Sequence, residues 1–268
     1  MTPGAVDLWV NLLTPEVARR MSGMYFGAEV APESPDQVLE VMDRCGVQTA
    51  VLTAGLRHGA DELLKIADEH RGRFLVAGTV DRFEHPVVMA RRVRELALHR
   101  RFALVRVTPL TDQHPLNGRL YYPVYAACAE AGVPVSINVG VPGPPLRSAV
   151  QDPVLLEDVL IDFPGLTVIG AHMGHPYEAL LMTYMRKWPA LHLSNSAYLA
   201  RYMDPELVRF MGSSQGRGRV LFASDHPFLP MDRAVDAARA VDLDEVSLEE
   251  FLGGAARRLL RTEDRARG

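Results

Sequence analysis

Two short segments place acidic and imidazole side chains where they could move protons. In LFASDHPF, an apolar run ends directly in Asp225, which is followed by His226 and by Pro227, a residue that blocks a helix. In VIGAHMGHP, a similar run ends in His172, with His175 three residues later. A carboxylate and an imidazole can exchange protons with a substrate or bind a metal ion. Each also has a simpler interpretation, because strand-end aspartates often cap turns and strand-end histidines often only pack.

Other apolar runs also end in polar residues. Read along the chain, these ends hold Asn11, Arg57, Asp81, Arg106, Asn138, His172, Asn195 or Ser196, and Asp225. A hydrophobic residue is the default at such positions. The pattern therefore predicts that several strand ends converge on one shared polar site.

The elements that would position these residues are short β-branched runs that alternate with longer amphipathic segments. Such alternation is typical of parallel βα units. We expect strands at residues 5–11, 48–54, 73–80, 102–108, 133–139, 166–172, 190–196 and 219–225. This pattern predicts an α/β fold, a single (β/α)8 TIM barrel spanning residues 1–268 as one domain. An open doubly wound sheet is the competing fold, but no GxGxxG follows the first strand.

Helix signals between the strands support the barrel. SPDQVLEVMDRCG should begin at Ser34 or Pro35 and end at Gly46. HPVVMARRVRELALHR repeats apolar residues at intervals of three and four, as an amphipathic helix does. A closing helix is expected at about residues 247–260, because Ser247 and Glu250 form a capping-box pattern.

Composition excludes several classes of function. The chain has 268 residues, of which 48% are hydrophobic and 23% charged, as expected for a globular protein. A net charge of -4 and the lack of a basic stripe argue against a nucleic-acid partner. There is no membrane-length apolar run and no leader-like start. Cys45 and Cys128 fit buried thiols in a reducing compartment, so we expect a cytoplasmic protein that acts on a small molecule.

Together these segments resemble the amidohydrolase superfamily, specifically its amidohydrolase-related branch that includes aminocarboxymuconate-semialdehyde decarboxylase. RGRFLVAGTVD is similar to the third strand of that family and FALVRVTPL to the fourth. VIGAHMGHP is similar to its HxG strand, LFASDHPF to its terminal SDxP strand, and FLGGAARRLL to its closing helix. The resemblance covers nearly the whole chain and implies a barrel enzyme, with a homodimer possible.

The resemblance also implies a metal site, from which this chain departs. Family members hold one divalent metal, often zinc, through an HxH pair on strand one, a histidine on strand five and the aspartate of strand eight. Here Trp9 and Asn11 replace the HxH pair and Asn138 replaces the strand-five histidine, while Asp225 matches. An indole cannot coordinate a metal, and amide oxygens compete poorly for zinc. We therefore expect a degenerate metal site and no cofactor.

Some members of the superfamily, the pyrone dicarboxylate lactonases, are similar in being metal-free and using the terminal aspartate as a base. By that resemblance, Asp225 would be the general base, and His172, at the proton-handling position, the acid or electrostatic partner. The expected activity is hydrolysis or elimination at a small carboxylated cyclic or conjugated substrate.

Further residues are expected to bind that substrate. Arg106 is costly to bury unpaired, so it meets either a carboxylate of the protein, Asp81 or Asp225, or one on a ligand. Arg57 is a second such candidate. Trp9 would offer a flat apolar face, and the two strand-end asparagines would donate hydrogen bonds. The complete expected substrate-binding set is Trp9, Asn11, Arg57, Arg106, Asn138, His175, Ser196 and His226.

Two alternatives stay open on the sequence alone. The first is a metal-dependent decarboxylase or hydrolase with an altered ligand set, in which Asp225 and His172 hold a divalent metal such as zinc, with His175 or His226 added. The second is a non-catalytic binding or scaffold protein that has kept the barrel.

Overall fold

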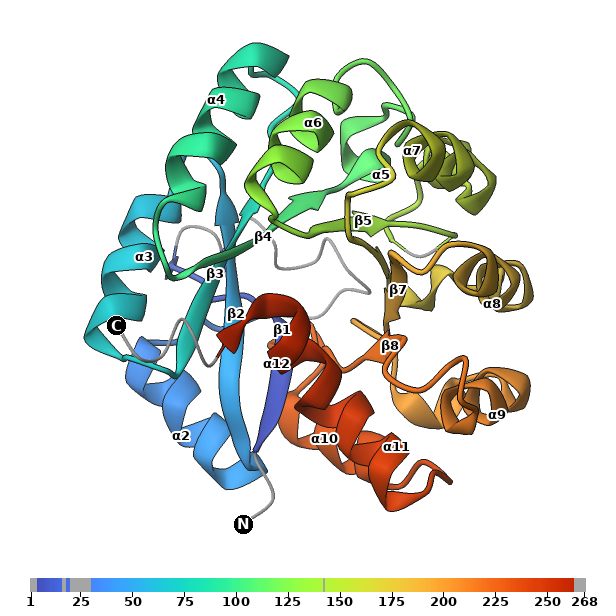
Figure 1. The fold of residues 1–268 in the computed structure, drawn as a ribbon. Coiled ribbons are helices and arrows are strands. Elements are labelled where there is room, and N and C mark those ends of the chain that lie inside the picture. The colour runs from blue at the N-terminus through green and yellow to red at the C-terminus, as the bar shows by residue number, and fades with distance from the viewer. Residues whose placement is uncertain (1–3, 16–17, 20–29, 142, 263–268) are drawn as a thin grey trace.

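The protein is a barrel of eight parallel strands surrounded by helices (Figure 1). The computed structural model describes residues 4–15, 18–19, 30–141 and 143–262. The strands are β1 Ala5–Val10, β2 Val47–Gly55, β3 Phe74–Thr79, β4 Phe102–Val107, β5 Val135–Asn138, β6 Val168–Ala171, β7 Leu191–Ser194 and β8 Val220–Leu221. All eight predicted strands are confirmed, and their order in the sheet follows the chain. The predicted (β/α)8 class is therefore confirmed.

The barrel closes between β1 and the segment that follows β8. The backbone N–H of Leu8 donates to the carbonyl of Phe222 at 3.1 Å, and Asp225 N–H donates to the carbonyl of Trp9 at 2.9 Å. Asn11 N–H donates to the carbonyl of His226 at 2.7 Å. Regular β8 is shorter than the predicted 219–225, since it ends at Leu221; further on, Asp225 has a φ of 69°. This seam places the end of the first strand next to the segment that follows the last strand.

Helices cover the outside of the barrel (Figure 1). They are α2 Pro35–Cys45, α3 Ala60–Glu69, α4 Pro86–Ala97, α5 Pro109–Asp112, α6 Tyr122–Ala131, α7 Leu156–Asp162, α8 Glu178–Lys187, α9 Pro205–Gly212, α10 Met231–Arg239, α11 Glu245–Glu249 and α12 Ala255–Leu260. Within the described residues, no helix is both long and apolar enough to span a membrane.

The first helix signal is confirmed, and the last is corrected. Ser34 caps α2 through a capping box with Gln37, and Gly46 ends the helix in a left-handed conformation. The closing helix instead begins at α11, where Asp244 accepts a hydrogen bond from the N–H of Ser247. Ser247 lies inside this helix, so its predicted capping role is wrong. A π-helical segment, Glu250–Gly254, joins α11 to α12.

Two apolar clusters hold the barrel together. The larger lies between the strands and the helices, and it includes the buried thiols of Cys45 and Cys128, as expected. The smaller contains inward-facing residues such as Val51, Leu75 and Ile169, together with Ala256 of α12. The helix α12 packs against β1, and the two lie close together in Figure 1. Because apolar side chains fill this interior, the polar residues at the strand ends stand out as a separate site.

Candidate active site

Asp225 lies where β1 and β8 meet, and its carboxylate is held by Asn11. The side-chain N–H of Asn11 donates to Asp225 Oδ1 at 2.8 Å and to the carbonyl of His226 at 3.0 Å. The Asn11 oxygen in turn accepts a hydrogen bond from the indole N–H of Trp9 at 3.3 Å. Asn11 therefore positions Asp225, and its amide N–H is not directed at a substrate as the sequence suggested.

The environment of Asp225 makes it a proton-exchanging group. Burial raises the pKa of its carboxyl to about 7. The Asn11 hydrogen bond and the charge of Arg106 oppose that rise, whereas the nearby Asp7 carboxyl adds to it. A carboxyl with this pKa exists in both protonation states near neutral pH, as a group that both gives and takes protons must.

Arg106 lies beneath Trp9, with only 1% of its surface exposed. Its guanidinium carbon is 3.7 Å from the centre of the Trp9 ring. Its Nε donates to the Thr53 hydroxyl at 3.0 Å, and a terminal nitrogen donates to the carbonyl of Leu8. Among the described residues it forms no ion pair, so the expected pairing with Asp81 or Asp225 is not observed.

No carboxylate among the described residues therefore neutralises the charge on Arg106 by direct contact. Burial lowers its pKa to about 9, and the charges of Asp225 and Asp7 oppose that shift. Because Trp9 covers the guanidinium, Arg106 sets the electrostatic potential of the site from behind the indole. This differs from the direct substrate contact expected from the sequence.

His172 directly follows β6 and adopts a left-handed conformation, with a φ of 60°. Its Nδ1 lies 2.9 Å from the carbonyl oxygen of Ser196, and its backbone N–H donates to the Ser196 hydroxyl at 3.1 Å. A carbonyl can only accept, so Nδ1 carries the proton and Nε2 keeps a lone pair. The ring lies 5.2 Å from that of Trp9.

His172 is a neutral acceptor at neutral pH. Its pKa is lowered to about 4, mainly by burial and also by the charge of Arg106, while the Ser196 carbonyl opposes the shift. The expectation that His172 acts as an acid thus has no support in this geometry, whereas its neutral Nε2 can accept a proton or a hydrogen bond.

His226 is directed away from the strand-end site. Its Nδ1 accepts a hydrogen bond from the N–H of Met231 at 3.3 Å, at the start of α10. Its Nε2 therefore carries the proton and donates to Glu33 Oε2 at 2.7 Å. With both nitrogens engaged, His226 ties the chain before α2 to the barrel, which is not the substrate contact expected from the sequence.

The remaining candidates lie around the rim of the site. His175 is half-exposed, and its Nδ1 is 2.7 Å from Glu178 Oε1. Arg57 is also half-exposed and is paired with Glu84. Asn138, at the end of β5, has a buried side-chain oxygen with no hydrogen-bond partner among the described residues. Of the three, only Asn138 offers an acceptor that lacks a partner.

Four contributors were missed by the sequence reasoning: Asp7, Glu33, Thr53 and Ser224. Asp7 and Ser224 are fully buried and hydrogen-bonded to each other. The signal for Asp7 was available, because a charged residue inside the apolar run AVDLWV is as unusual as Arg106 inside FALVRV. Thr53 and Glu33 carry no comparable signal, since such residues are common in strands and loops.

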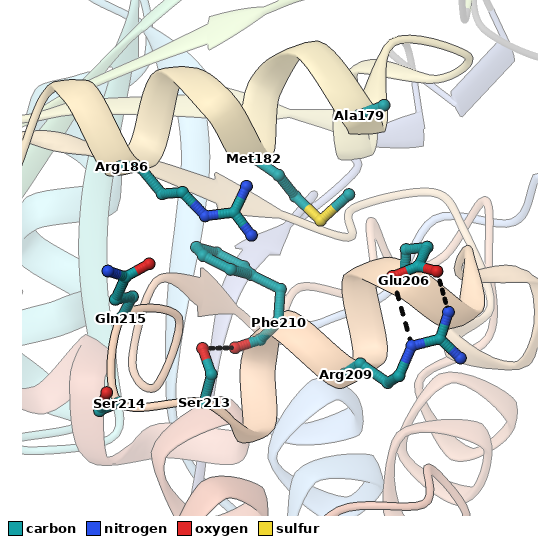
Figure 2. A pocket seen from close by; sticks show the side chains of 9 residues that line it. All are labelled: Ala179, Met182, Arg186, Glu206, Arg209, Phe210, Ser213, Ser214 and Gln215. Atoms are coloured by element: carbon teal, nitrogen blue, oxygen red, sulfur yellow. Dashed lines mark hydrogen bonds and ion pairs between the residues drawn. The ribbon is translucent and has the colours of Figure 1, made fainter.

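A hollow of about 530 Å³ lies elsewhere, between α8 and α9 (Figure 2). Met182 and the Phe210 ring face it, with the Arg186 guanidinium 5.0 Å above that ring. Glu206 and Arg209 pair with each other at its edge. None of the predicted site residues lines this hollow, so the strand-end cluster remains the candidate active site.

A family model described as Amidohydrolase matches residues 6–262. No curated protein matches the chain by sequence. An uncharacterised TIM-barrel protein from Bordetella bronchiseptica has a similar structure, with a TM-score of 0.78 at 21% identity, covering 97% of this chain and 99% of that one. A 2,6-dihydroxybenzoate decarboxylase from Rhizobium gives a TM-score of 0.78 at 18% identity, covering 97% and 99%.

A third structural neighbour bears on the cofactor. A dihydroxybenzoic acid decarboxylase from Polaromonas, with bound manganese and the inhibitor 2-nitroresorcinol, gives a TM-score of 0.76 at 16% identity and covers 97% of both chains. This finding contradicts the expectation of no cofactor and points to a divalent metal for proteins of this fold.

This chain supplies only part of the ligand set that such an ion requires. Asp225 and Nε2 of His172 are the groups that would hold it. In the described part of the chain, no three His, Cys, Asp or Glu side chains are grouped so that they could bind a metal. A site of the zinc type needs about three protein ligands. Because the described donors do not fit a complete set, we assign no catalytic step to a metal.

Proposed function

Because the chain belongs to the amidohydrolase family, we propose that it is a lyase of the decarboxylase branch that removes carbon dioxide from a small carboxylated aromatic compound. The observation that carries this proposal is the carboxyl of Asp225, with a pKa raised to about 7 at the strand ends of the barrel. The named substrates of two structural neighbours are aromatic acids, which favours decarboxylation over lactone hydrolysis.

Substrate binding would use the aromatic and electrostatic character of the site. Trp9 presents an indole that can pack against an aromatic ring. The unpaired charge of Arg106 behind it favours a negative group, such as the carboxylate of the substrate. Asn138, whose side-chain oxygen has no partner in the part of the chain that the structure describes, would accept a hydrogen bond from a ring hydroxyl.

Proton transfer to the ring would be the role of Asp225. In its protonated form it donates its proton to the ring carbon that bears the carboxylate. The bond between that carbon and the carboxylate then breaks, its electron pair restores the aromatic ring, and carbon dioxide leaves. The Asp225 carboxylate regains a proton from water. This sequence uses Asp225 as the acid, whereas hydrolysis would use it as the base expected from the sequence.

His172 would assist by accepting. Its neutral Nε2 can take a hydrogen bond from a hydroxyl of the substrate, which increases electron density in the ring and favours protonation at carbon. This role requires the hydroxyl to be close to the carboxylate, and it makes ortho-hydroxybenzoates the preferred substrate class.

The experiment that tests this function measures carbon dioxide released from 2,6-dihydroxybenzoate, 5-carboxyvanillate and salicylate, with manganese supplied. Reactions run in deuterium oxide should give a product that carries deuterium at the carbon that lost the carboxylate. Release from at least one compound, with that label, supports the proposal. No release from any of them by the folded protein overturns it.

A further inference from the structure

Asp7 is a buried carboxylate that the proposed chemistry does not use. It lies on β1 with none of its surface exposed. Its Oδ1 accepts hydrogen bonds from the N–H of Trp9 at 3.0 Å and of Ser224 at 2.9 Å. Its Oδ2 accepts from the Ser224 hydroxyl at 2.5 Å. Burying a carboxylate is unfavourable for the free energy of folding, so its presence in the barrel interior indicates a specific role.

We propose that Asp7, acting through Ser224, is the positioning residue that holds Asp225 in place for proton transfer. This inference rests on the proposed function, because it assumes that Asp225 is the proton donor. Asp7 itself does not contact the substrate: it is fully buried, and its described partners are Trp9 and Ser224.

The backbone at Asp225 shows why a positioning residue is needed. Its φ of 69° is one that residues other than glycine adopt infrequently, and such conformations persist only when their surroundings fix them. The Ser224 hydroxyl donates to Asp7 and accepts from the N–H of His226 at 2.9 Å. Asp7 therefore fixes the residues on both sides of Asp225, directly at Ser224 and through its hydroxyl at His226.

A purely structural role for the contact between Asp7 and Ser224 would lower stability and leave kcat unchanged.

The test compares four variants: Asp7→Asn, Ser224→Ala, Asp225→Asn and a control, Ser247→Ala. Ser247 is also buried and donates to a carboxylate, Asp244 Oδ2, at 2.7 Å, but it lies on α11. Carbon dioxide release from the best compound of the panel gives kcat and KM.

For Asp7→Asn we expect kcat to fall by about tenfold or more with little change in KM, because the amide nitrogen that replaces Oδ2 cannot accept the hydrogen bond from the Ser224 hydroxyl. Ser224→Ala should lower kcat by about tenfold or more with little change in KM, since alanine cannot bridge Asp7 and His226. Ser247→Ala should lose stability but keep the wild-type kcat and KM.

The outcomes separate the two proposals. Full turnover in Asp225→Asn would refute the proposed function. An inactive Asp225→Asn combined with wild-type kcat and KM in both Asp7→Asn and Ser224→Ala would refute only the positioning role. If Asp7→Asn does not fold, the kcat of Ser224→Ala decides: a tenfold loss supports the role and a wild-type value overturns it.

Discussion

At the scale of single residues, the electrostatic potential of the site depends on two buried ionisable side chains that do not form an ion pair among the described residues. Arg106 is buried behind Trp9 without an ion pair among the described residues, and Asp225 receives one amide hydrogen bond from Asn11. In a low-dielectric setting these charges act strongly on each other and on a ligand. Arg106 lowers the pKa of both Asp225 and His172, which favours an ionised carboxylate and a neutral imidazole.

Replacing Arg106 by methionine tests the effect of its charge on Asp225 and on a ligand. Without the cation, the pKa of Asp225 should rise above its present value of about 7, since Arg106 holds it down. Affinity for 2,6-dihydroxybenzoate should fall by about tenfold or more, the usual effect of losing a buried cation for an anionic ligand. Calorimetric titration measures this change.

Two controls make the Arg106→Met result specific. Resorcinol lacks the carboxylate, so its affinity should change little. Arg94→Met removes an arginine paired with Glu130 on the outer surface and should leave both ligands unaffected. Equal losses for the acid and for resorcinol would show that Arg106 shapes the site and does not attract the carboxylate.

The sequence singled out the two candidates for proton transfer but not how they are held. Asp225 and His172 stand out because each ends an apolar run, and a strand end in a barrel faces the site. The roles of Asn11 and His226 could not be predicted, because they depend on backbone carbonyls and helix starts from distant parts of the chain. The protonated nitrogen of His172 likewise follows from Ser196, which is far away in sequence.

At the scale of elements, the loops after β5 and β6 must approach each other closely to position His172. A Cβ on Gly140 would lie 2.5 Å from the backbone carbon of Gly174 and 2.5 Å from the carbonyl oxygen of His175. Gly140 also adopts a φ of +88°, which disfavours any side chain. Real Cβ atoms do not approach backbone this closely, so the contact requires glycine.

Gly140→Ala should therefore lower the free energy of unfolding by more than about 2 kcal/mol, through overpacking and backbone strain together. Gly132→Ala is the matched control: Gly132 ends α6 with a φ of +63° and has nothing within 4 Å of the added carbon. It should lose only about 1 kcal/mol. Chemical denaturation measures both, and equal losses would show that the loop contact is not important.

The strands were predictable because a short β-branched apolar run is a local signal, and their ends agree within a few residues except at β8. Regular β8 ends at Leu221, where the backbone N–H of the next residue, Phe222, donates to the carbonyl of Phe251 at 3.1 Å. That contact joins distant segments, so no local pattern predicts it. At the closing helix, Asp244 takes the capping position that was expected for Ser247.

At the scale of the whole molecule, buried ionisable groups make stability depend on pH. The folded state keeps His192 of β7 neutral, since burial lowers its pKa to about 4, and its Nδ1 has no partner among the described residues. Unfolded histidine takes up a proton below about pH 6.5. The stabilising contribution is therefore complete above pH 6.5 and is lost as the pH falls towards 4.

His192→Leu should remove the loss of stability that protonation of this histidine causes at low pH. Between pH 7 and pH 5 the free energy of unfolding of the variant should fall by about 2 kcal/mol less than that of the wild type, the equivalent of roughly one and a half pKa units. Urea denaturation at the two pH values measures the difference, with the exposed His58→Leu as the control. An identical fall in wild type and His192→Leu would contradict the prediction.

The measurement that tests the central claim most directly is the rate of carbon dioxide release by wild type and Asp225→Asn, using the best compound of the aromatic-acid panel. Asparagine keeps the shape of the side chain but cannot donate an acidic proton, so turnover should fall by about 100-fold or more. In the wild type, the rate should decline above pH 7, as Asp225 loses its proton. Equal rates in the two proteins would remove Asp225 from the reaction and contradict the account.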